Sequence, residues 1–185
     1  MPKRTGDPIT LGSGKLYYQE HTGSTMPNFE AIKALCTDTN RLGLIKSGAS
    51  LTYTEETYEE KDDLGLVSKI ITTKEEVKFK AGLITWTGNT LGVLIDRSTV
   101  STTAGSVRTT KIGGAGNTKG KYYTLVFHHE DETDGDLWVV IVGRNTAGLS
   151  LTFASESGSM IEPEFTAKPH DDDGTLVTIY EELSA

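Results

Sequence analysis

The chain has 185 residues, a formal net charge of −8, 36% hydrophobic residues and 24% charged residues. This composition excludes an intrinsically disordered chain. The longest apolar run, Leu137 to Val142, is far shorter than the roughly 20 residues of a membrane-spanning helix. The acidic excess argues against nucleic-acid binding, which needs a dense basic surface.

The length suits one domain over residues 1–185,. Residues 1–14 are punctuated by glycine and proline, so we expect a mobile N-terminal arm there. Cys36 is the only cysteine, which rules out an intrachain disulfide, and residues 1–8 hold no apolar segment of a secretory signal. We therefore expect folding in the cytosol.

The first third of the chain predicts two strands around a short helix. Residues 15–21 and residues 42–54 alternate in the manner of strands,. Between them the apolar residues recur at helical spacing over residues 28–36, and Asn28 is placed to cap that helix.

An acidic segment then separates two strand patterns. Residues 55–65 hold six carboxylates and a single lysine, without an apolar stripe of helical length. We interpret this segment as a long extended loop near residues 55–67. The strand pattern returns over residues 66–79, where Val77 and Phe79 alternate with lysines.

The main helix is predicted near residues 87–98, because Leu91, Leu94 and Ile95 lie three and four residues apart,. Residues 99–106 are interpreted as a Ser/Thr/Gly connector. Strand patterns follow over residues 107–112, 121–129, 137–142, 149–153, 160–167 and 176–182.

Turn signals recur every 8 to 15 residues or so in this second half, a spacing typical of a β-sandwich or barrel. The run at residues 137–142 is apolar on both faces and must be covered on both sides. The sequence therefore predicts a mainly β fold of two packed antiparallel sheets.

Two motifs partly match phosphate-binding or metal-binding patterns, but neither pattern is complete. The segment Gly12–Lys15 lacks the further glycine and the Ser or Thr of a phosphate loop, and it precedes a strand rather than a helix,. His128 and His129 are adjacent on a predicted strand, so their side chains point to opposite faces.

Two further features also lack a complete pattern. Residues 171–174 begin like a calcium loop but lack the glutamate that closes one, so a turn closed by Gly174 is expected,. Cys36 has no marked histidine partner and is expected to be a small apolar residue. We predict no enzyme, no cofactor and no metal site.

The acidic residues are concentrated in three loop segments, which hold 14 of the 26 carboxylates. Such crowding is unfavourable within a monomer because like charges repel. It suits a surface that must not bind polyanions. The candidate acidic surface comprises Glu55, Glu56, Glu60, Glu130, Asp131, Glu132, Asp171, Asp172 and Asp173.

A series of short motifs resembles the tail tube (major tail) proteins of long-tailed bacteriophages and related prophage or bacteriocin tubes. The motifs run in order along most of the chain and none is a catalytic signature. They lie at residues 26–30, 39–45, 47–53, 58–65, 73–82, 111–114 and 173–177.

The resemblance implies two packed sheets flanked by a helix, in a subunit that assembles into stacked hexameric rings. These rings would form the tail tube, a channel that delivers the genome into the host. It also implies partners: further copies of the chain and the tape measure, baseplate or distal tail and tail terminator proteins. DNA would pass without specific binding, and the protein would lie in the virion tail after assembly in the host cytoplasm.

The acidic segment is the natural arm to reach a neighbouring copy. The candidate interface residues are Tyr58, Glu59, Asp62, Asp63, Leu64, Leu66 and Val67. Two alternatives stay open: the inner tube of a contractile bacteriocin or secretion device, and a ligand-binding β-sandwich. The sandwich alternative needs exposed aromatic residues, whereas Trp86 and Trp138 lie in apolar runs that indicate a core.

Overall fold

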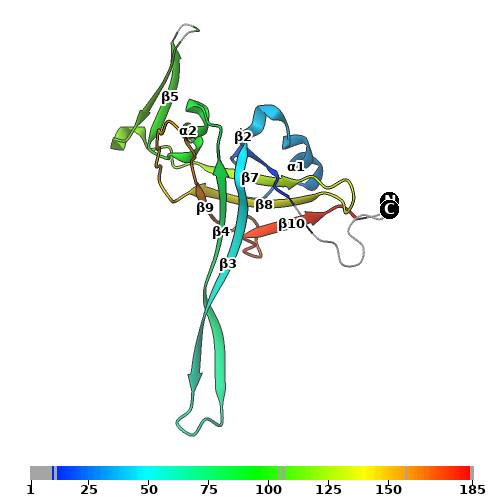
Figure 1. The fold of residues 1–185 in the computed structure, drawn as a ribbon. Coiled ribbons are helices and arrows are strands. Elements are labelled where there is room, and N and C mark those ends of the chain that lie inside the picture. The colour runs from blue at the N-terminus through cyan, green and yellow to red at the C-terminus, as the bar shows by residue number, and fades with distance from the viewer. Residues whose placement is uncertain (1–9, 11, 104, 106, 157, 184–185) are drawn as a thin grey trace.

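The computed structural model describes residue 10, residues 12–103, residue 105, residues 107–156 and residues 158–183. The protein is mainly β, as predicted, with a large antiparallel sheet, a small second sheet and two α-helices in the described residues (Figure 1). Most of the predicted N-terminal arm, residues 1–9 and 11, lies outside the described residues.

The described residues include ten strands, which make up about half of them. They are β1 Lys15–His21, β2 Arg41–Gly43, β3 Ile45–Lys61, β4 Ser68–Leu83, β5 Ser98–Thr103, β6 Val107–Ile112, β7 Tyr122–His129, β8 Leu137–Asn145, β9 Glu164–Ala167 and β10 Val177–Glu181. The helices are α1 Phe29–Leu35 and α2 Gly88–Leu94, with 3-10 turns at Asp38–Asn40 and Ala115–Asn117.

The large sheet has the strand order β2-β1-β7-β8-β9-β4-β3, and all of its pairs are antiparallel. Strand β8 pairs with β7 along one edge, while its other edge is shared between β10 and β9. Strands β5 and β6 form the separate two-stranded sheet. The predicted packing of two complete sheets against each other stays a prediction.

The large sheet curls until its two end strands meet. Strand β2 ends at Gly43 and β3 begins at Ile45, so Leu44 alone joins opposite ends of the strand order. The Leu44 amide donates to Thr85 Oγ1 at 2.7 Å, and the Leu44 carbonyl accepts the Ile84 amide at 2.9 Å. The sequence predicted one strand over residues 42–54, which is wrong at this junction because the chain changes partner strands there.

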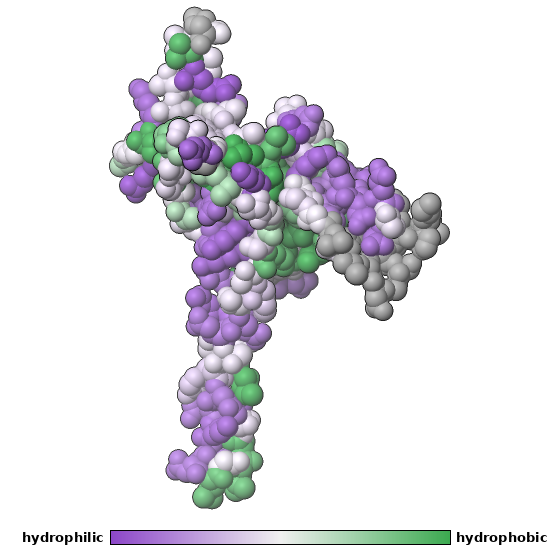
Figure 2. Space-filling view, viewed as in Figure 1, coloured by the Kyte–Doolittle hydropathy of each residue, from purple (hydrophilic) through white to green (hydrophobic). Residues whose placement is uncertain are grey.

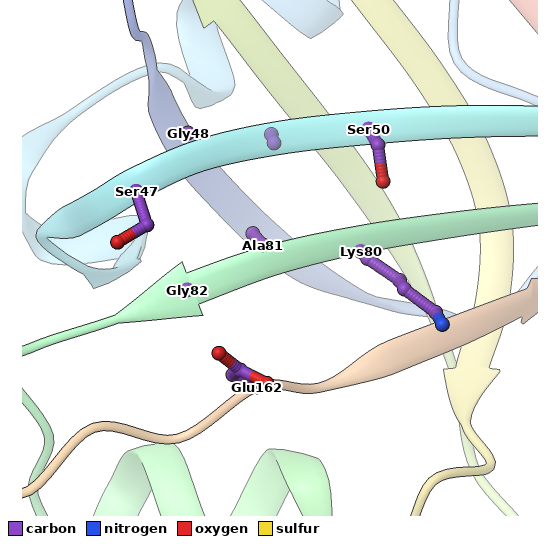
Figure 3. Close-up of a pocket in the computed structure, with 8 residues that line it drawn as sticks. Ser47, Gly48, Ser50, Lys80, Ala81, Gly82 and Glu162 are labelled. Carbon is purple, nitrogen blue, oxygen red and sulfur yellow. The ribbon is translucent and has the colours of Figure 1, made fainter.

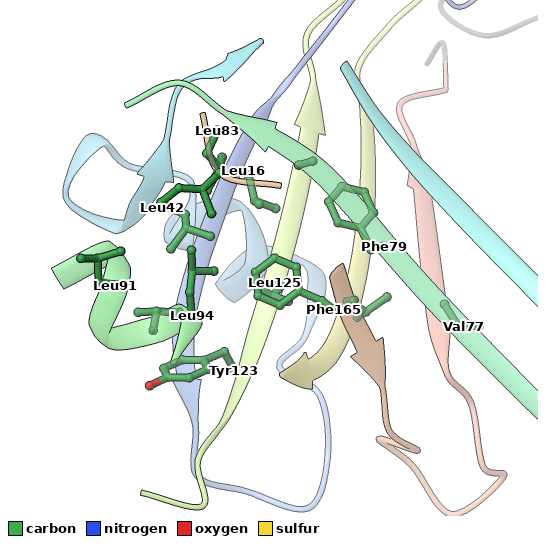
Figure 4. Close-up of a cluster of buried hydrophobic side chains, with 14 residues drawn as sticks. Leu16, Leu42, Val77, Phe79, Leu83, Leu91, Leu94, Tyr123, Leu125 and Phe165 are labelled. Carbon is green, nitrogen blue, oxygen red and sulfur yellow. The ribbon is translucent and has the colours of Figure 1, made fainter. Parts of the chain in front are cut away.

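The concave side of the curl holds the larger core cluster (Figure 4). Phe165 and Leu125 are completely or almost completely buried within it. Helix α2 closes the cluster with Leu91 and Leu94, which Figure 4 shows beside the buried side chains of the sheet. Burying a side chain of this size contributes roughly 1.5–3 kcal/mol.

The convex side holds a second cluster beneath α1. Ile32 and Leu35 of the helix pack there with Trp138 and Val140 of β8. Because Ile141 belongs to the other cluster, β8 is covered on both faces, as its sequence predicted. The α1 prediction is confirmed as well, since Asn28 Oδ1 accepts the Ala31 amide at 3.0 Å.

Helix α2 is shorter than the predicted helix near residues 87–98. It begins after Thr87, whose hydroxyl accepts the Thr90 amide, and ends at Leu94. Ile95 is already extended, and the Ser98 hydroxyl donates to the Ile95 carbonyl at 2.7 Å. The connector predicted at residues 99–106 is wrong for residues 99–103, which pair with β6 as part of strand β5.

Two strand predictions near the C-terminus need correction. Residues 149–153 alternate in sequence, yet no strand is assigned there. Leu149 and Leu151 instead pack as single side chains against the larger core cluster. In residues 160–167 only β9 is a strand, preceded by one bridge between Ile161 and Leu83.

The loop predicted near residues 55–67 is wrong for its first half. Strand β3 continues through the acidic segment to Lys61, and only residues 62–67 form the turn into β4. Groups on the opposite strand stabilise two of the carboxylates: Glu55 accepts the Thr72 hydroxyl at 2.6 Å, and Glu56 forms an ion pair with Lys74 at 3.3 Å. The acidic arm is thus a β-hairpin.

Candidate assembly surface

The outer half of the β3–β4 hairpin stands free of the rest of the protein (Figure 1). Strand β9 pairs with β4 only at Lys78, Phe79 and Lys80, and no other strand pairs with the hairpin in the described residues. Nine residues of β4, from Ser68 to Glu76, lie beyond this contact and beyond the buried Val77. At about 3.3 Å per residue the hairpin projects ~30 Å from the body.

The end of the hairpin is apolar and exposed. We define the hairpin tip as residues 62–71. Within it Leu64 is 80% exposed, Leu66 79% and Val67 71%, and Ile70 and Ile71 are also exposed. Figure 2 shows this green end beyond a largely hydrophilic stem. Exposed apolar clusters are typical of surfaces that contact other molecules, so the tip is a candidate for such a surface.

Hydrogen bonds within the turn hold the tip in one shape. The Asp62 carboxylate accepts the Val67 amide at 2.7 Å and the Leu64 amide at 3.3 Å. Gly65 has a φ of 68°, which only glycine adopts readily,. The bond from Val67, followed by weaker backbone bonds, lowers the pKa of Asp62 below its ordinary value.

The stem below the tip has polar cross-strand pairs. The Tyr53 hydroxyl donates to Glu75 at 2.7 Å, and this bond raises the pKa of Tyr53 to about 12. The Tyr58 hydroxyl donates to Glu60 on the same strand. The Tyr53 bond therefore links β3 to β4, whereas the Tyr58 bond lies within β3.

The predicted interface residues therefore lie together. Tyr58 and Glu59 are on β3, and Asp62, Asp63, Leu64, Leu66 and Val67 form the turn. Sequence reasoning missed Ile70 and Ile71 of the returning strand. The sequence feature that could have revealed them is a pair of adjacent isoleucines in an otherwise polar stretch.

The three acidic segments are not brought together within one chain. Glu55, Glu56 and Glu60 lie on the hairpin, residues 130–136 form the turn between β7 and β8, and residues 171–173 precede β10. Each segment therefore lies at a different part of the fold.

Local partners hold several of these acids. Glu130 pairs with Lys15 at 2.7 Å, and the Asp131 carboxylate accepts the Thr133 and Asp134 amides at 2.9 Å. Asp171 accepts the Thr175 amide at 2.8 Å. The remaining predicted members, Glu132, Asp172 and Asp173, are exposed to solvent.

The histidine pair behaves as its position on a strand predicts. His128 stacks on Trp138 with ring centroids 4.7 Å apart, and its Nε2 lies 2.9 Å from Asp136. His129 points to the other face, where its Nδ1 lies 2.8 Å from the Ser13 carbonyl oxygen. The two rings therefore do not converge on one point.

The other tested motifs also have local structural roles. Residues 171–174 form the expected turn, with Gly174 at a φ of 81°. Cys36 is half-buried, and burial raises the pKa of its thiol to about 11. Among the described residues, no group of three or more His, Cys, Asp or Glu side chains could hold a metal ion.

A shallow depression lies where β3 bulges (Figure 3). Ser47 and Gly48 have φ values of 70° and 80°, and the register of β3 against β4 shifts there. The depression has a volume of about 250 Å3, with Lys80 and Glu162 at its border. Lys80 pairs with Glu164 at 2.7 Å, so its ammonium group already has a partner.

A larger groove lies at the junction of β2 and β3. We call it the junction groove, and its volume is about 520 Å3. Its lining includes Lys15, Leu44, Ile45, Lys46, Ile84 and Glu130. Leu44, Ile45 and Ile84 give it an apolar part, and polar or charged residues complete the lining: Ser13, Lys15, Lys46, His128 and Glu130.

Comparison with known proteins adds no family assignment. No protein-family model matches the chain, and no curated protein matches it. No helix in the described part of the chain has the length and apolar character needed to cross a membrane.

Proposed function

We propose that this chain is the subunit of a bacteriophage tail tube, which self-assembles into stacked hexameric rings around a channel for DNA. The motif resemblance described above suggests this role. The observation that carries the proposal is the free β3–β4 hairpin, which extends ~30 Å and ends in exposed aliphatic side chains. An isolated soluble chain gains no stability from such an arm.

The open edges of the sheet support assembly with copies of the same chain. Strand β3 has 17 residues and pairs only with β4 among the described strands. A long open edge is an aggregation hazard unless another chain covers it. Copies joined head-to-tail around a ring would cover these edges, and their strands would continue into one barrel.

The negative net charge of the chain is consistent with a channel through which DNA passes without binding. Duplex DNA carries about one negative charge per 1.7 Å, and the chain has a net charge of −8. A channel with a net negative wall repels the duplex and lets it slide. We propose that tape measure, baseplate and terminator proteins complete the tail.

The inner tube of a contractile bacteriocin or secretion device is the second candidate, because the same hairpin serves a tube without DNA. Co-assembly with a sheath protein separates this candidate from a non-contractile tail. The ligand-binding alternative has less support, because Trp138 is buried and Trp86 is partly buried in the core.

Negative-stain electron microscopy of the purified protein tests the proposal. We expect rings or rods roughly 100 Å wide, a width estimated from the size of the domain, at high protein concentration. Deletion of residues 58–66 should leave a folded monomer that forms neither. Globular monomers of the full chain at every concentration, even with a tail-tip complex added as initiator, would contradict the proposal.

A further inference from the structure

The junction groove and the hairpin tip lie at opposite ends of the same pair of strands. Leu44 and Ile45 of the groove stand where β3 begins, whereas the tip follows Lys61, where β3 ends. Figure 1 shows these two ends far apart, with the body of the protein beside one of them. Seventeen residues of strand span ~55 Å, so a copy is unable to place its own tip in its own groove.

The groove matches the tip in chemical character. Leu44 is 45% exposed although it is aliphatic, and it lines the groove together with Ile45 and Ile84. The volume of about 520 Å3 is large enough for more than one aliphatic side chain,. Leu64 and Leu66 are the most exposed aliphatic side chains of the tip.

The charges at the two surfaces are complementary. Lys46 lies at the groove, is exposed, and has no ion pair among the described residues. Asp63 lies beside Leu64 at the tip, and it likewise has no ion pair in the described part of the chain. Lys15 and Glu130, also at the groove, already neutralise each other at 2.7 Å, so Lys46 is the cation that attracts an acidic partner.

We propose that the junction groove binds the hairpin tip of a second copy of this chain, with Leu64 and Leu66 against Leu44 and Asp63 beside Lys46. A tip and a groove on opposite ends of one subunit make a head-to-tail contact. Such a contact repeats from copy to copy and forms a ring or a filament. The inference rests on the proposed self-assembly and names the surface that receives the arm.

Cross-linking between two differently marked copies tests this contact. In a Cys36→Ser background, one preparation carries Leu66→Cys and the other carries Leu44→Cys, and the two are mixed with a short bismaleimide. We expect a covalent dimer in the mixture and little in either preparation alone. Efficient cross-linking of the Leu66→Cys protein to itself would show a tip-to-tip contact and overturn the proposal.

The same experiment with residues 1–9 deleted excludes another occupant of the groove. We expect the same yield of dimer with and without these residues. A dimer that forms only after their deletion would show that the chain fills its own groove, which contradicts the proposal.

Charge exchange supplies a second test. Asp63→Lys or Lys46→Asp alone should raise the concentration needed for half-maximal assembly roughly threefold. The double variant with both changes should restore the original value. Glu132→Lys, a matched change of an exposed acid in the β7–β8 turn, should not reproduce this pattern, and equal effects of all three single variants would overturn the pairing.

These experiments distinguish a failure of the proposed tip–groove contact from a failure of the proposed tail-tube function. Rods without the Leu66–Leu44 cross-link would contradict the contact and leave the proposed function in place. A cross-link in filaments that lack a channel would support the contact and contradict the tube.

Discussion

Asp62 and Val67 are joined by two hydrogen bonds across the turn of the hairpin. The Asp62 amide donates to the Val67 carbonyl at 3.1 Å, and the Val67 amide donates to the Asp62 carboxylate at 2.7 Å. The apolar residues between them are therefore displayed on a closed loop. The Asp62 carboxylate thus accepts one of the two bonds that close the loop proposed for assembly.

The order of the tip should depend on pH through Asp62. Its pKa in the folded chain lies below the ordinary value of 3.8, chiefly because the charged carboxylate accepts the Val67 amide. The stabilisation of the turn by the charged Asp62 carboxylate is therefore complete above pH 3.8, the ordinary pKa. It is lost as the pH falls through the lowered pKa of the folded chain. NMR titration should show Asp62 protonating with a midpoint below pH 3.8.

Substitution of the same residue gives a matched comparison. Asp62→Ala should reduce the protection of the Val67 amide against hydrogen exchange, whereas Asp63→Ala should not. Equal protection of Val67 in both variants would mean that the backbone bond alone closes the turn.

The outer hairpin should contribute little to the stability of the single chain. Residues 57–73 are all exposed, so their removal uncovers no core. Replacing them by Asn-Gly places a two-residue turn between Glu56 and Lys74, which are already cross-strand partners,. We expect the free energy of unfolding to change by less than about 1 kcal/mol, as measured by urea denaturation.

A core substitution gives the size of a large stability loss, with which the truncated hairpin is compared. Phe165→Ala should reduce the free energy of unfolding by roughly 3–5 kcal/mol, because Phe165 is completely buried in the larger core cluster. A truncated hairpin that is as destabilised as this variant would show that the arm is part of the folding unit.

Gly43 is needed where the curled sheet closes. A Cβ at this position would collide with the backbone carbonyl oxygen of Thr85, which has no flexible side chain to move aside. We expect Gly43→Ala to destabilise the protein by roughly 1–3 kcal/mol in thermal or urea unfolding. Gly116→Ala is the control, since a Cβ there meets nothing within 4 Å, and a similar loss in both variants would contradict the close approach.

Much of the fold could be predicted from local patterns. The residues of β1, α1, β6, β7 and β8 alternate or repeat with clear periodicity, and the structure matches those predictions closely. Val140 and Ile141 even show that β8 must be covered on both faces. In these elements the pattern of burial and the local preference of the chain agree.

The hairpin and the closure of the sheet were not predictable in the same way. Acidic residues are unfavourable in strands, and the partners that offset Glu55 and Glu56 lie 17 and 18 residues away, at Thr72 and Lys74. Leu44 has no local signal that it joins opposite ends of the sheet. The sequence predicted that the tip residues belong to an extended arm. It did not predict the junction groove, because the groove is formed by segments that only the fold brings together.

The thiol of Cys36 should react slowly with alkylating reagents while the protein is folded. Burial is the main cause that raises its pKa from 9.0 to about 11, with the charge of Glu130 adding to it. At pH 8 the reactive thiolate is then about 100-fold scarcer than for an unshifted thiol. Iodoacetamide labelling followed by mass spectrometry should show this slow rate in buffer and an ordinary rate in urea. Equally fast labelling in both conditions would place Cys36 in solvent, outside the cluster that it forms with Ile32 and Trp138 beneath α1.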